Sequence, residues 1–160
     1  MKYLGIILIL LSALLVSREY RCYMQKRLDE CLGFCNFIAH MKIQVGCYLR
    51  PVRELARGFS SAALSRTGFL SSVEKCDSLG KAFSECEPSL SLSEEERGEL
   101  RAFFSSFGDG YLEQGVQAIE TAHTNMERLM AALSEQKDKN IRLVSTLSVT
   151  LALGVAILII

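Results

Sequence analysis

A chain of 160 residues, 49% of them hydrophobic, has room for one folded domain and for no independent second core. Its 18 basic and 18 acidic residues cancel, so no global positive charge attracts nucleic acid or an anionic membrane surface at long range. Tryptophan is absent, proline is rare, and the alternating Val, Ile and Thr typical of strands is hard to find, so we expect an all-α fold.

Apolar residues concentrate at the two ends of the chain. No charged side chain occurs in Tyr3–Ser17 or in Leu143–Ile160. A membrane-spanning helix needs about 20 predominantly apolar residues, so the pattern predicts transmembrane segments at 1–17 and 143–160, with a helical domain at 18–142 between them. A cleaved signal peptide is the alternative for the first segment. No good small-x-small cleavage site ends that run, which favours an uncleaved anchor.

Basic residues flank both predicted spans on the side of the central domain. They are Arg18, Arg21, Lys26 and Arg27 after the first span, and Lys137, Lys139 and Arg142 before the second. Because Lys and Arg accumulate on the cytoplasmic side of a span, we expect residues 18–142 in the cytoplasm and both termini on the far side. Cytoplasmic thiols are normally reduced, so the six cysteines are not expected to form a disulfide framework.

A metal site is not expected either. The closest cysteine pair is Cys31-x-x-x-Cys35, and the only histidines, His40 and His123, do not stand at ligand spacing from it. No cofactor is predicted. Cys31 and Cys35 instead belong to an apolar stripe with helical spacing, and we interpret them as small core residues. The stripe consists of Met24, Leu28, Cys31, Cys35, Ile38, Met41 and Val45.

The first predicted helix continues from the membrane segment to about Val45, because no proline or glycine pair interrupts it. Pro51 stands where the first turn of a helix tolerates it, so a second helix is expected to begin near Arg50. The clearest linker lies at 87–93, where Pro88 is surrounded by serines.

Three serines mark further helix starts. Ser71 with Glu74 fits a capping box, and Ser78 precedes another apolar helical turn. The strongest signal is Ser93 followed by three glutamates, which supply a capping-box carboxylate and complement the helix dipole. This signal predicts a helix over Glu94–Phe107.

The last predicted helix runs from about Tyr111 into the C-terminal apolar segment, after a Gly108-Asp109-Gly110 turn. Apolar residues at alternating spacings of four and three form a coiled-coil-like seam on it. The seam contains Leu112, Val116, Ile119, His123, Met126, Met130 and Leu133. We expect it to pack antiparallel to the stripe of the first helix, with the short helices completing a bundle.

No constellation of residues suggests catalysis. The sequence has no nucleophile in a motif context, no glycine-rich phosphate loop and no zinc pattern, so we expect a protein that is not an enzyme. The consecutive Glu94, Glu95 and Glu96 point in different directions around a helix and form a solvated or partner-facing N-terminus more readily than an acid/base pair.

Several short sequence elements, spread over the whole chain, resemble those of a known family in their order and spacing. They are the short span after Met1-Lys2, the Pro51–Ala56 stretch PVRELA, the Phe-rich helix ending at Phe107-Gly108, Glu113-Gln114, Lys139-Asn140 and the C-terminal LGVAILII. Together they resemble the stage III sporulation protein AB family of endospore-forming bacteria. That family is similar to the F component of type II secretion systems, whose cytoplasmic helical domains share the pattern in Asp77–Phe83.

The resemblance implies a non-catalytic membrane component of a secretion-like sporulation channel between mother cell and forespore. It places the protein in the mother-cell membrane around the forespore, with its main domain in the cytoplasm. The implied partners are a secretion-type ATPase of the same complex and other membrane and ring-forming channel proteins. The protein would couple that ATPase to the membrane assembly.

Charged residues without an assignable partner in the sequence are candidates for the partner-binding surface, at the bundle tip remote from the membrane. They are Arg50, Arg53, Glu54, Arg57, Glu94, Glu95 and Glu96. Two other classes of function stay open: a self-assembling structural membrane protein without an ATPase partner, and a membrane-bound enzyme. An adaptor binds a motor, a self-assembler forms defined oligomers alone, and an enzyme needs clustered, perturbed titratable groups.

Overall fold

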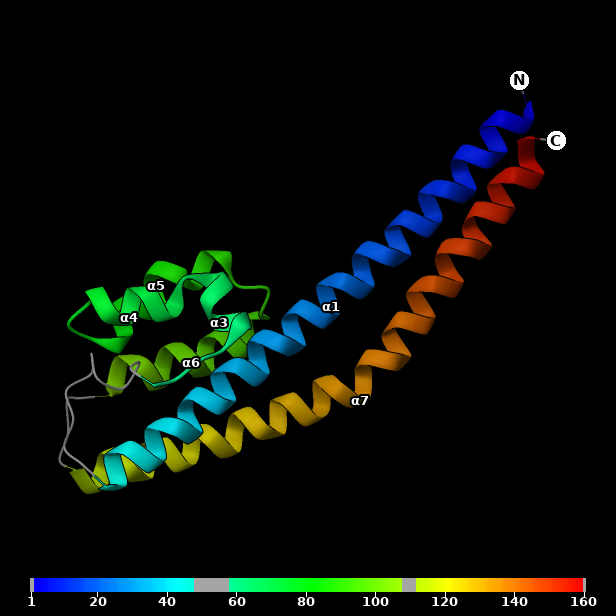
Figure 1. Cartoon of the computed structure of the whole chain (residues 1–160). Helices are drawn as coiled ribbons and strands as arrows, with labels where there is room; N and C mark the ends of the chain where they lie inside the picture. Colours follow the sequence, from blue (N-terminus) through cyan, green and yellow to red (C-terminus); the bar gives the residue numbers. More distant parts are fainter. Residues whose placement is uncertain (1, 48–57, 108–111, 160) are drawn as a thin grey trace. The chain divides into compact units, whose positions relative to one another are not determined.

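The computed structural model describes residues 2–47, 58–107 and 112–159, which are helical with short connections and contain no strand (Figure 1). The predicted all-α fold is confirmed. In chain order the elements are α1 (Lys2–Cys47), α3 (Ala62–Thr67), α4 (Phe69–Lys75), α5 (Leu79–Cys86), the 3₁₀ turn η1 (Glu87–Ser89), α6 (Glu94–Ser106) and α7 (Leu112–Ile159). The helix predicted near Arg50 and the turn predicted at Gly108–Gly110 lie outside the described residues.

Two compact units divide the chain, and each contains one part of α1 and one part of α7. Unit 1 is Met1–Gln25 with Ala132–Ile160, and unit 2 is Lys26–Ala131. In unit 1, Lys137 Nζ donates a hydrogen bond of 2.6 Å to Gln25 Oε1. In unit 2, Lys42 Nζ lies 3.0 Å from Glu120 Oε1. Such contacts between the first and last helices fit the antiparallel pairing that the sequence predicts.

An aromatic cluster forms the centre of unit 2. The ring of Phe34 on α1 lies 5.1 Å from Phe69 of α4, 5.8 Å from Phe83 of α5 and 6.1 Å from Phe104 of α6, between ring centroids. Phe37, one turn further along α1, joins the same cluster, and all five side chains are buried. Edge-to-face pairs of this kind add about 0.5–1.5 kcal/mol each beyond the burial of apolar area. Phenylalanines therefore connect α4, α5 and α6 to α1.

The predicted apolar stripe of α1 is largely buried, and the seam of α7 is buried at alternate positions. On α1, Met24, Cys31, Cys35, Ile38 and Met41 are buried and Leu28 is half-buried. On α7, Ile119, Met126 and Leu133 are buried, whereas Val116, His123 and Met130 are half-buried. The interpretation of Cys31 and Cys35 as core residues is confirmed.

Two of the three predicted serine starts are confirmed. Ser78 Oγ accepts from the Lys81 N–H at 3.3 Å and caps α5. Ser93 Oγ accepts from the Glu96 N–H at 3.4 Å, and a Glu96 carboxylate oxygen accepts from the Ser93 N–H at 2.7 Å. This capping box opens α6 as predicted.

The predicted helix start at Ser71 is wrong, because α4 already begins at Phe69. Gly68 takes a left-handed conformation, with φ of 82°, which ends α3 and lets the chain enter α4 at once. Ser71 therefore lies inside α4, and its hydroxyl donates to the Gly68 carbonyl at 2.7 Å. The Ser-x-x-Glu pattern alone does not indicate that Gly68, three residues earlier, separates α3 from α4.

Unit 1 does not support the two predicted membrane spans. Among the described residues, no helix has a stretch that is both long and apolar enough to cross a membrane. The uncharged run at the start of α1 is shorter than the length of about 20 residues that a span needs. The run at the end of α7 includes the hydroxyl residues Ser145, Thr146, Ser148 and Thr150.

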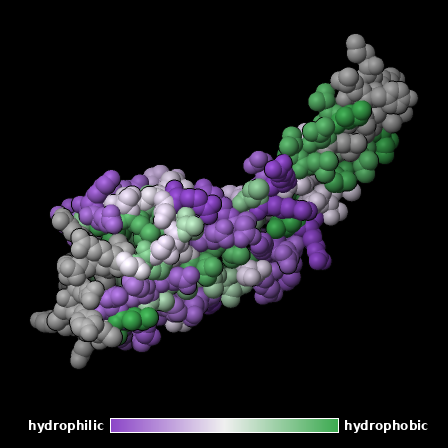
Figure 2. All heavy atoms as spheres, in the orientation of Figure 1, coloured by the Kyte–Doolittle hydropathy of each residue, from purple (hydrophilic) through white to green (hydrophobic). Residues whose placement is uncertain are grey.

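Large apolar side chains nevertheless face outward on unit 1. On α1 they are Ile7, Leu8, Leu11, Leu14, Leu15 and Val16, and on α7 they include Leu143, Leu147, Leu151, Leu153 and Ile157. Figure 2 shows this concentration of hydrophobic surface on the described part of unit 1, whereas the surface of unit 2 is mostly polar. Exposed apolar area of this extent is typical of a surface that contacts other apolar groups.

Candidate protein-interaction surface

The residues predicted to bind a partner fall into two groups. Arg50, Arg53, Glu54 and Arg57 lie outside the described residues. Glu94, Glu95 and Glu96 form the first turn of α6, and the structure separates them by burial. Glu94 and Glu95 are exposed, whereas Glu96 is buried.

Glu96 is an internal contact of unit 2 and is not available to a partner. Arg27 donates from Nε to Glu96 Oε2 and from Nη2 to Oε1, both at 2.9 Å. The Glu96 side chain is only 3% exposed, and that of Arg27 is 22% exposed. A bidentate guanidinium–carboxylate pair is strong and geometrically specific, so it fixes the start of α6 to α1. The pair lies roughly 30 Å along α1 from Cys47, the last residue of that helix.

Glu94 takes part in an exposed network of charged side chains. It lies 3.2 Å from Arg97 and 3.3 Å from Arg101. Arg101 also bonds to Glu87 of η1, and its hydrogen bonds to Glu87 and Glu94 raise the pKa of its guanidinium. Glu95 makes no hydrogen bond or ion pair with any other described residue. Of the three glutamates, Glu95 therefore fits the predicted role best.

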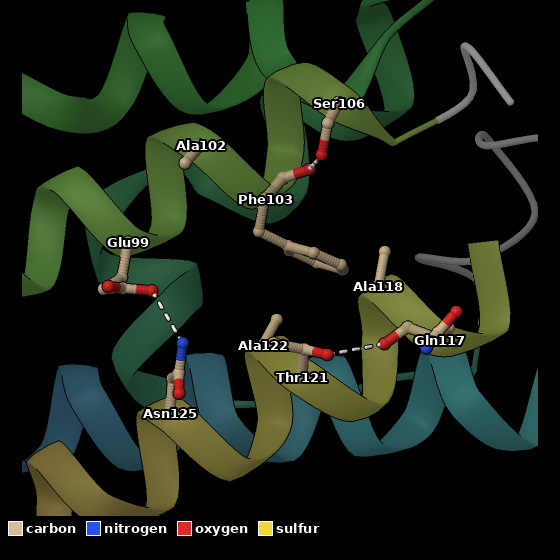
Figure 3. A pocket seen from close by; sticks show the side chains of 9 residues that line it. All are labelled: Glu99, Ala102, Phe103, Ser106, Gln117, Ala118, Thr121, Ala122 and Asn125. Atoms are coloured by element: carbon tan, nitrogen blue, oxygen red, sulfur yellow. Dashed lines mark hydrogen bonds between the residues drawn. The ribbon is translucent and has the colours of Figure 1, made fainter. Parts of the chain in front are cut away.

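An open groove of about 380 Å³ runs between α6 and the first part of α7 in unit 2 (Figure 3). Figure 3 shows the ring of Phe103 reaching from α6 into the groove toward Ala118 and Ala122 of α7. At one end, Asn125 Nδ2 donates to Glu99 Oε2 at 3.1 Å and connects the two helices. The lining consists of Glu99, Ala102, Phe103, Ser106, Gln117, Ala118, Thr121, Ala122 and Asn125. The groove thus combines an apolar floor with polar edges.

The sequence reading missed this groove. Its signal is faint: Ala118 and Ala122 repeat at a spacing of four on the side of α7 that does not belong to the predicted seam. Alanines in such positions are also ordinary helix formers, so the pattern has no meaning until α6 is placed beside α7.

The exposed carboxylates beside the groove belong to α6. Glu99 lines the groove and Glu95 precedes it by one turn. Glu94 is paired with Arg97 and Arg101, and Glu96 is buried against Arg27. On α7 the residues that line the groove are uncharged, Glu120 pairs with Lys42, and Glu127 lies 3.5 Å from His123. The acidic edge of the groove is therefore confined to α6.

A second polar contact fixes the linker at 87–93 to α1. The buried Glu30 accepts a hydrogen bond of 2.6 Å from the Ser91 N–H, and Lys26 lies 3.8 Å from its other oxygen. Burial raises the pKa of the Glu30 carboxyl, and the Ser91 hydrogen bond opposes the rise. Glu30 also lines a small cavity of about 200 Å³ with Arg66 and Ser89. Its position gives it a structural role between α1 and the chain before α6.

The buried cysteines are poor nucleophiles. Burial raises the pKa of Cys31 and Cys86 to about 12 and also raises that of Cys35. The reactive form of cysteine is the thiolate, which these thiols do not reach near neutral pH. Within the described ranges, no three His, Cys, Asp or Glu side chains gather in a way that suits a metal ion. His123 is half-buried and lies 3.5 Å from Glu127.

The fold defines an all-α protein with two long helices and a bundle of short ones, and its sequence matches a known family over its length. The model of the family described as Stage III sporulation protein AB covers residues 2–160. The chain belongs to this family and is a sporulation-related protein, which confirms the resemblance seen in the sequence. No curated protein and no solved structure matches it, so the likeness to the F component of type II secretion systems stays a prediction.

Proposed function

We propose that this protein is a non-catalytic membrane component of a secretion-like channel between mother cell and forespore, and that it couples a cytoplasmic secretion-type ATPase to the membrane assembly. The supporting observation is the difference between the units. Unit 2 buries six phenylalanines, whereas unit 1 leaves large apolar side chains such as Leu14 and Leu151 outside. One chain thus offers a packed domain for protein contacts and an apolar part for a membrane.

Unit 1 is the part that we assign to the mother-cell membrane around the forespore. Leu14 is 63% exposed and Leu151 is 72% exposed, and a lipid environment removes such side chains from water. Basic residues at 18, 21, 137, 139 and 142 suit the headgroup level on the cytoplasmic side. Unit 2 then belongs in the cytoplasm, where a motor is available.

The coupling role is supported by the course of the two long helices. Both α1 and α7 have residues in unit 1 and in unit 2. A partner bound to unit 2 is therefore connected to unit 1 by continuous helical backbone. No chemistry is required of the protein in this role, only binding.

One observation favours the alternative, a structural membrane protein that assembles with itself. Unit 1 has an apolar groove of about 350 Å³, lined by Ser12, Ala13, Val16, Leu147, Ser148, Leu151 and Ala152. Small residues such as the serines and alanines let apolar helices approach closely within a membrane. Defined oligomers of the purified protein, with no affinity for a motor, would favour this alternative.

Direct binding tests the coupling function. The full-length chain is purified in detergent micelles, and its binding to the secretion-type ATPase of the same organism is titrated, with empty micelles as the control. We expect saturable binding to the micelles that contain the protein. No binding above the control would contradict the ATPase partner.

Membrane attachment and orientation need a separate test. The partly exposed Cys76, which follows the last residue of α4, is treated in whole cells with a membrane-impermeant thiol reagent. We expect labelling only after lysis, and resistance of the protein to extraction with alkaline carbonate. Release by carbonate would indicate that unit 1 lies at the membrane surface, and labelling of intact cells would contradict the cytoplasmic position of unit 2.

A further inference from the structure

We propose that the groove between α6 and α7 is the docking site for a basic amphipathic helix of a protein partner. The proposal rests on the proposed function, in which this partner is the secretion-type ATPase. It differs from the sequence prediction, which centred the partner surface on the charges at 50–57 and 94–96.

The shape and lining of the groove suit a helix. From Glu99 to Ser106 the α6 wall extends for roughly 10 Å, which accommodates about two turns of a partner helix. The floor consists of three apolar residues, the large Phe103 and the small Ala118 and Ala122. Recognition of a helix in a groove uses apolar anchors on one face of the ligand at such spacings. The Asn125–Glu99 hydrogen bond holds the walls together at one end.

The charge of the rim indicates a basic ligand. Among the described residues that line the groove, Glu99 alone is charged, and Glu95 precedes it by one turn on the same side of α6. Glu95 has no interaction with another described residue, so its carboxylate is free to pair with a partner. Arg128 follows Asn125 on α7, which confines the acidic part of the rim to α6. A lysine or arginine beside the apolar face of the ligand would meet this edge.

The same features disfavour other ligands. The groove offers no basic residue in its described lining, whereas nucleic-acid binding depends on neutralising phosphates with basic residues. A small-molecule site is usually a cleft that encloses most of its ligand, whereas this groove is open. A protein helix meets both the open shape and the single acidic edge.

Two pairs of matched variants test the proposal in the full-length chain in detergent micelles. Ala102→Trp places an indole in the groove, and Ala131→Trp adds the same bulk at an exposed position of α7 outside the lining. Glu95→Lys reverses the charge at the rim, and Glu74→Lys reverses an exposed charge on α4. Thermal unfolding followed by circular dichroism checks that each variant is folded, and the Kd for the ATPase is measured at low and high salt.

We expect Ala102→Trp to weaken ATPase binding by about tenfold or more, because the indole occupies the space of the ligand. Glu95→Lys should raise the Kd several-fold at low salt and less at high salt, since salt screens exposed charges. Both controls should bind as the wild type does. Equal binding by folded Ala102→Trp overturns the groove proposal but leaves the proposed function intact. No binding by the wild type overturns both, and the two failures are therefore distinguishable.

Discussion

The two units use the same pair of helices in opposite ways. In unit 2, α1 places Phe34, Phe37, Ile38 and Met41 against the rest of the chain with no exposed area. In unit 1, the described side chains of the same helix that are buried are Ala13, Ser17 and Met24, whereas Leu8, Leu11, Leu14 and Leu15 point outward. The cause is the number of neighbours: in unit 2, short helices pack on α1 besides α7, whereas unit 1 contains only parts of α1 and α7.

The difference teaches where the free energy of folding originates. Burial of apolar side chains within the chain stabilises unit 2 by itself. The exposed leucines of unit 1 contribute only when another apolar phase or protein covers them. Substitutions of the same kind should therefore have unequal effects in the two units.

The largest contrast is expected between a core phenylalanine and an outward leucine. Phe34→Ala leaves a cavity among Phe69, Phe83 and Phe104 and should lower the free energy of unfolding by about 3–5 kcal/mol. Leu14→Ala in unit 1 should change it by less than about 1 kcal/mol, because the micelle covers this side chain whether or not unit 2 is folded. Thermal denaturation of the micellar protein measures both. An equal loss for the two variants would contradict the separation into a self-sufficient unit and a dependent one.

Loss of a polar contact should likewise cost more stability in unit 2 than in unit 1. Arg27→Met leaves the Glu96 carboxylate buried without its cation and should cost about 2–4 kcal/mol. The matched change Lys137→Met removes an exposed hydrogen bond to Gln25 in unit 1 and should stay within about 0.5 kcal/mol of wild type. Chemical denaturation of both variants measures the two losses.

A second substitution separates the loss of a charge from the loss of packing. Adding Glu96→Gln to Arg27→Met removes the buried charge, so the double variant should recover part of the lost stability. If the double variant is less stable than Arg27→Met, the cost arises from the capping box of Glu96 and not from its uncompensated charge.

Glycine positions sharpen the comparison further. A Cβ at Gly80 of α5 would lie 3.2 Å from the Ser105 Cα and 3.3 Å from the Phe104 carbonyl oxygen, so Gly80→Ala forces α5 and α6 apart. We expect a loss of about 1–3 kcal/mol. A Cβ at Gly154 of unit 1 meets no atom within 4 Å, and Gly154→Ala should be neutral or slightly stabilising because alanine favours helix. The denaturation midpoint of Gly80→Ala should therefore fall, whereas that of Gly154→Ala should stay the same or rise slightly.

Much of this fold follows from local sequence signals. The capping serines at 78 and 93 predict the starts of α5 and α6, and the periodicity of apolar residues predicts the buried side of α1. These signals succeed because capping and amphipathic spacing act over one or two helical turns. Gly68 shows the limit, since a left-handed glycine between two short helices displaced the predicted start of α4.

The candidate surface was less predictable, because it depends on contacts between distant segments. Arg27 and Glu96 are 69 residues apart, and only their contact shows that Glu96 belongs to the interior and Glu95 to the surface. The groove forms between the alanines of α7 and Phe103 of α6, so the sequence of one helix alone does not predict it. The sequence alone could not show that Glu96 is buried, and partner binding by Glu95 stays a prediction.

The smallest expected effect concerns pH and the buried Glu30. Burial raises the pKa of this carboxyl above its usual 4.5, so the folded chain retains the proton to higher pH than the unfolded chain. Its contribution to stability is then fully present below pH 4.5 and is lost as the pH rises through the folded-state pKa. Glu30→Gln does not titrate, and its side-chain oxygen can still accept from the Ser91 N–H.

The melting temperature of Glu30→Gln should equal that of the wild type near pH 4 and exceed it increasingly toward pH 7, by about a few degrees. Glu19→Gln, at an exposed position of unit 1, is the matched control and should follow the wild-type profile. A constant gap across the pH range would mean that Glu30→Gln acts through packing. If the melting temperature of the wild type instead rises relative to that of Glu30→Gln as the pH rises, the interactions with Lys26 and Ser91 outweigh the cost of burying the charge.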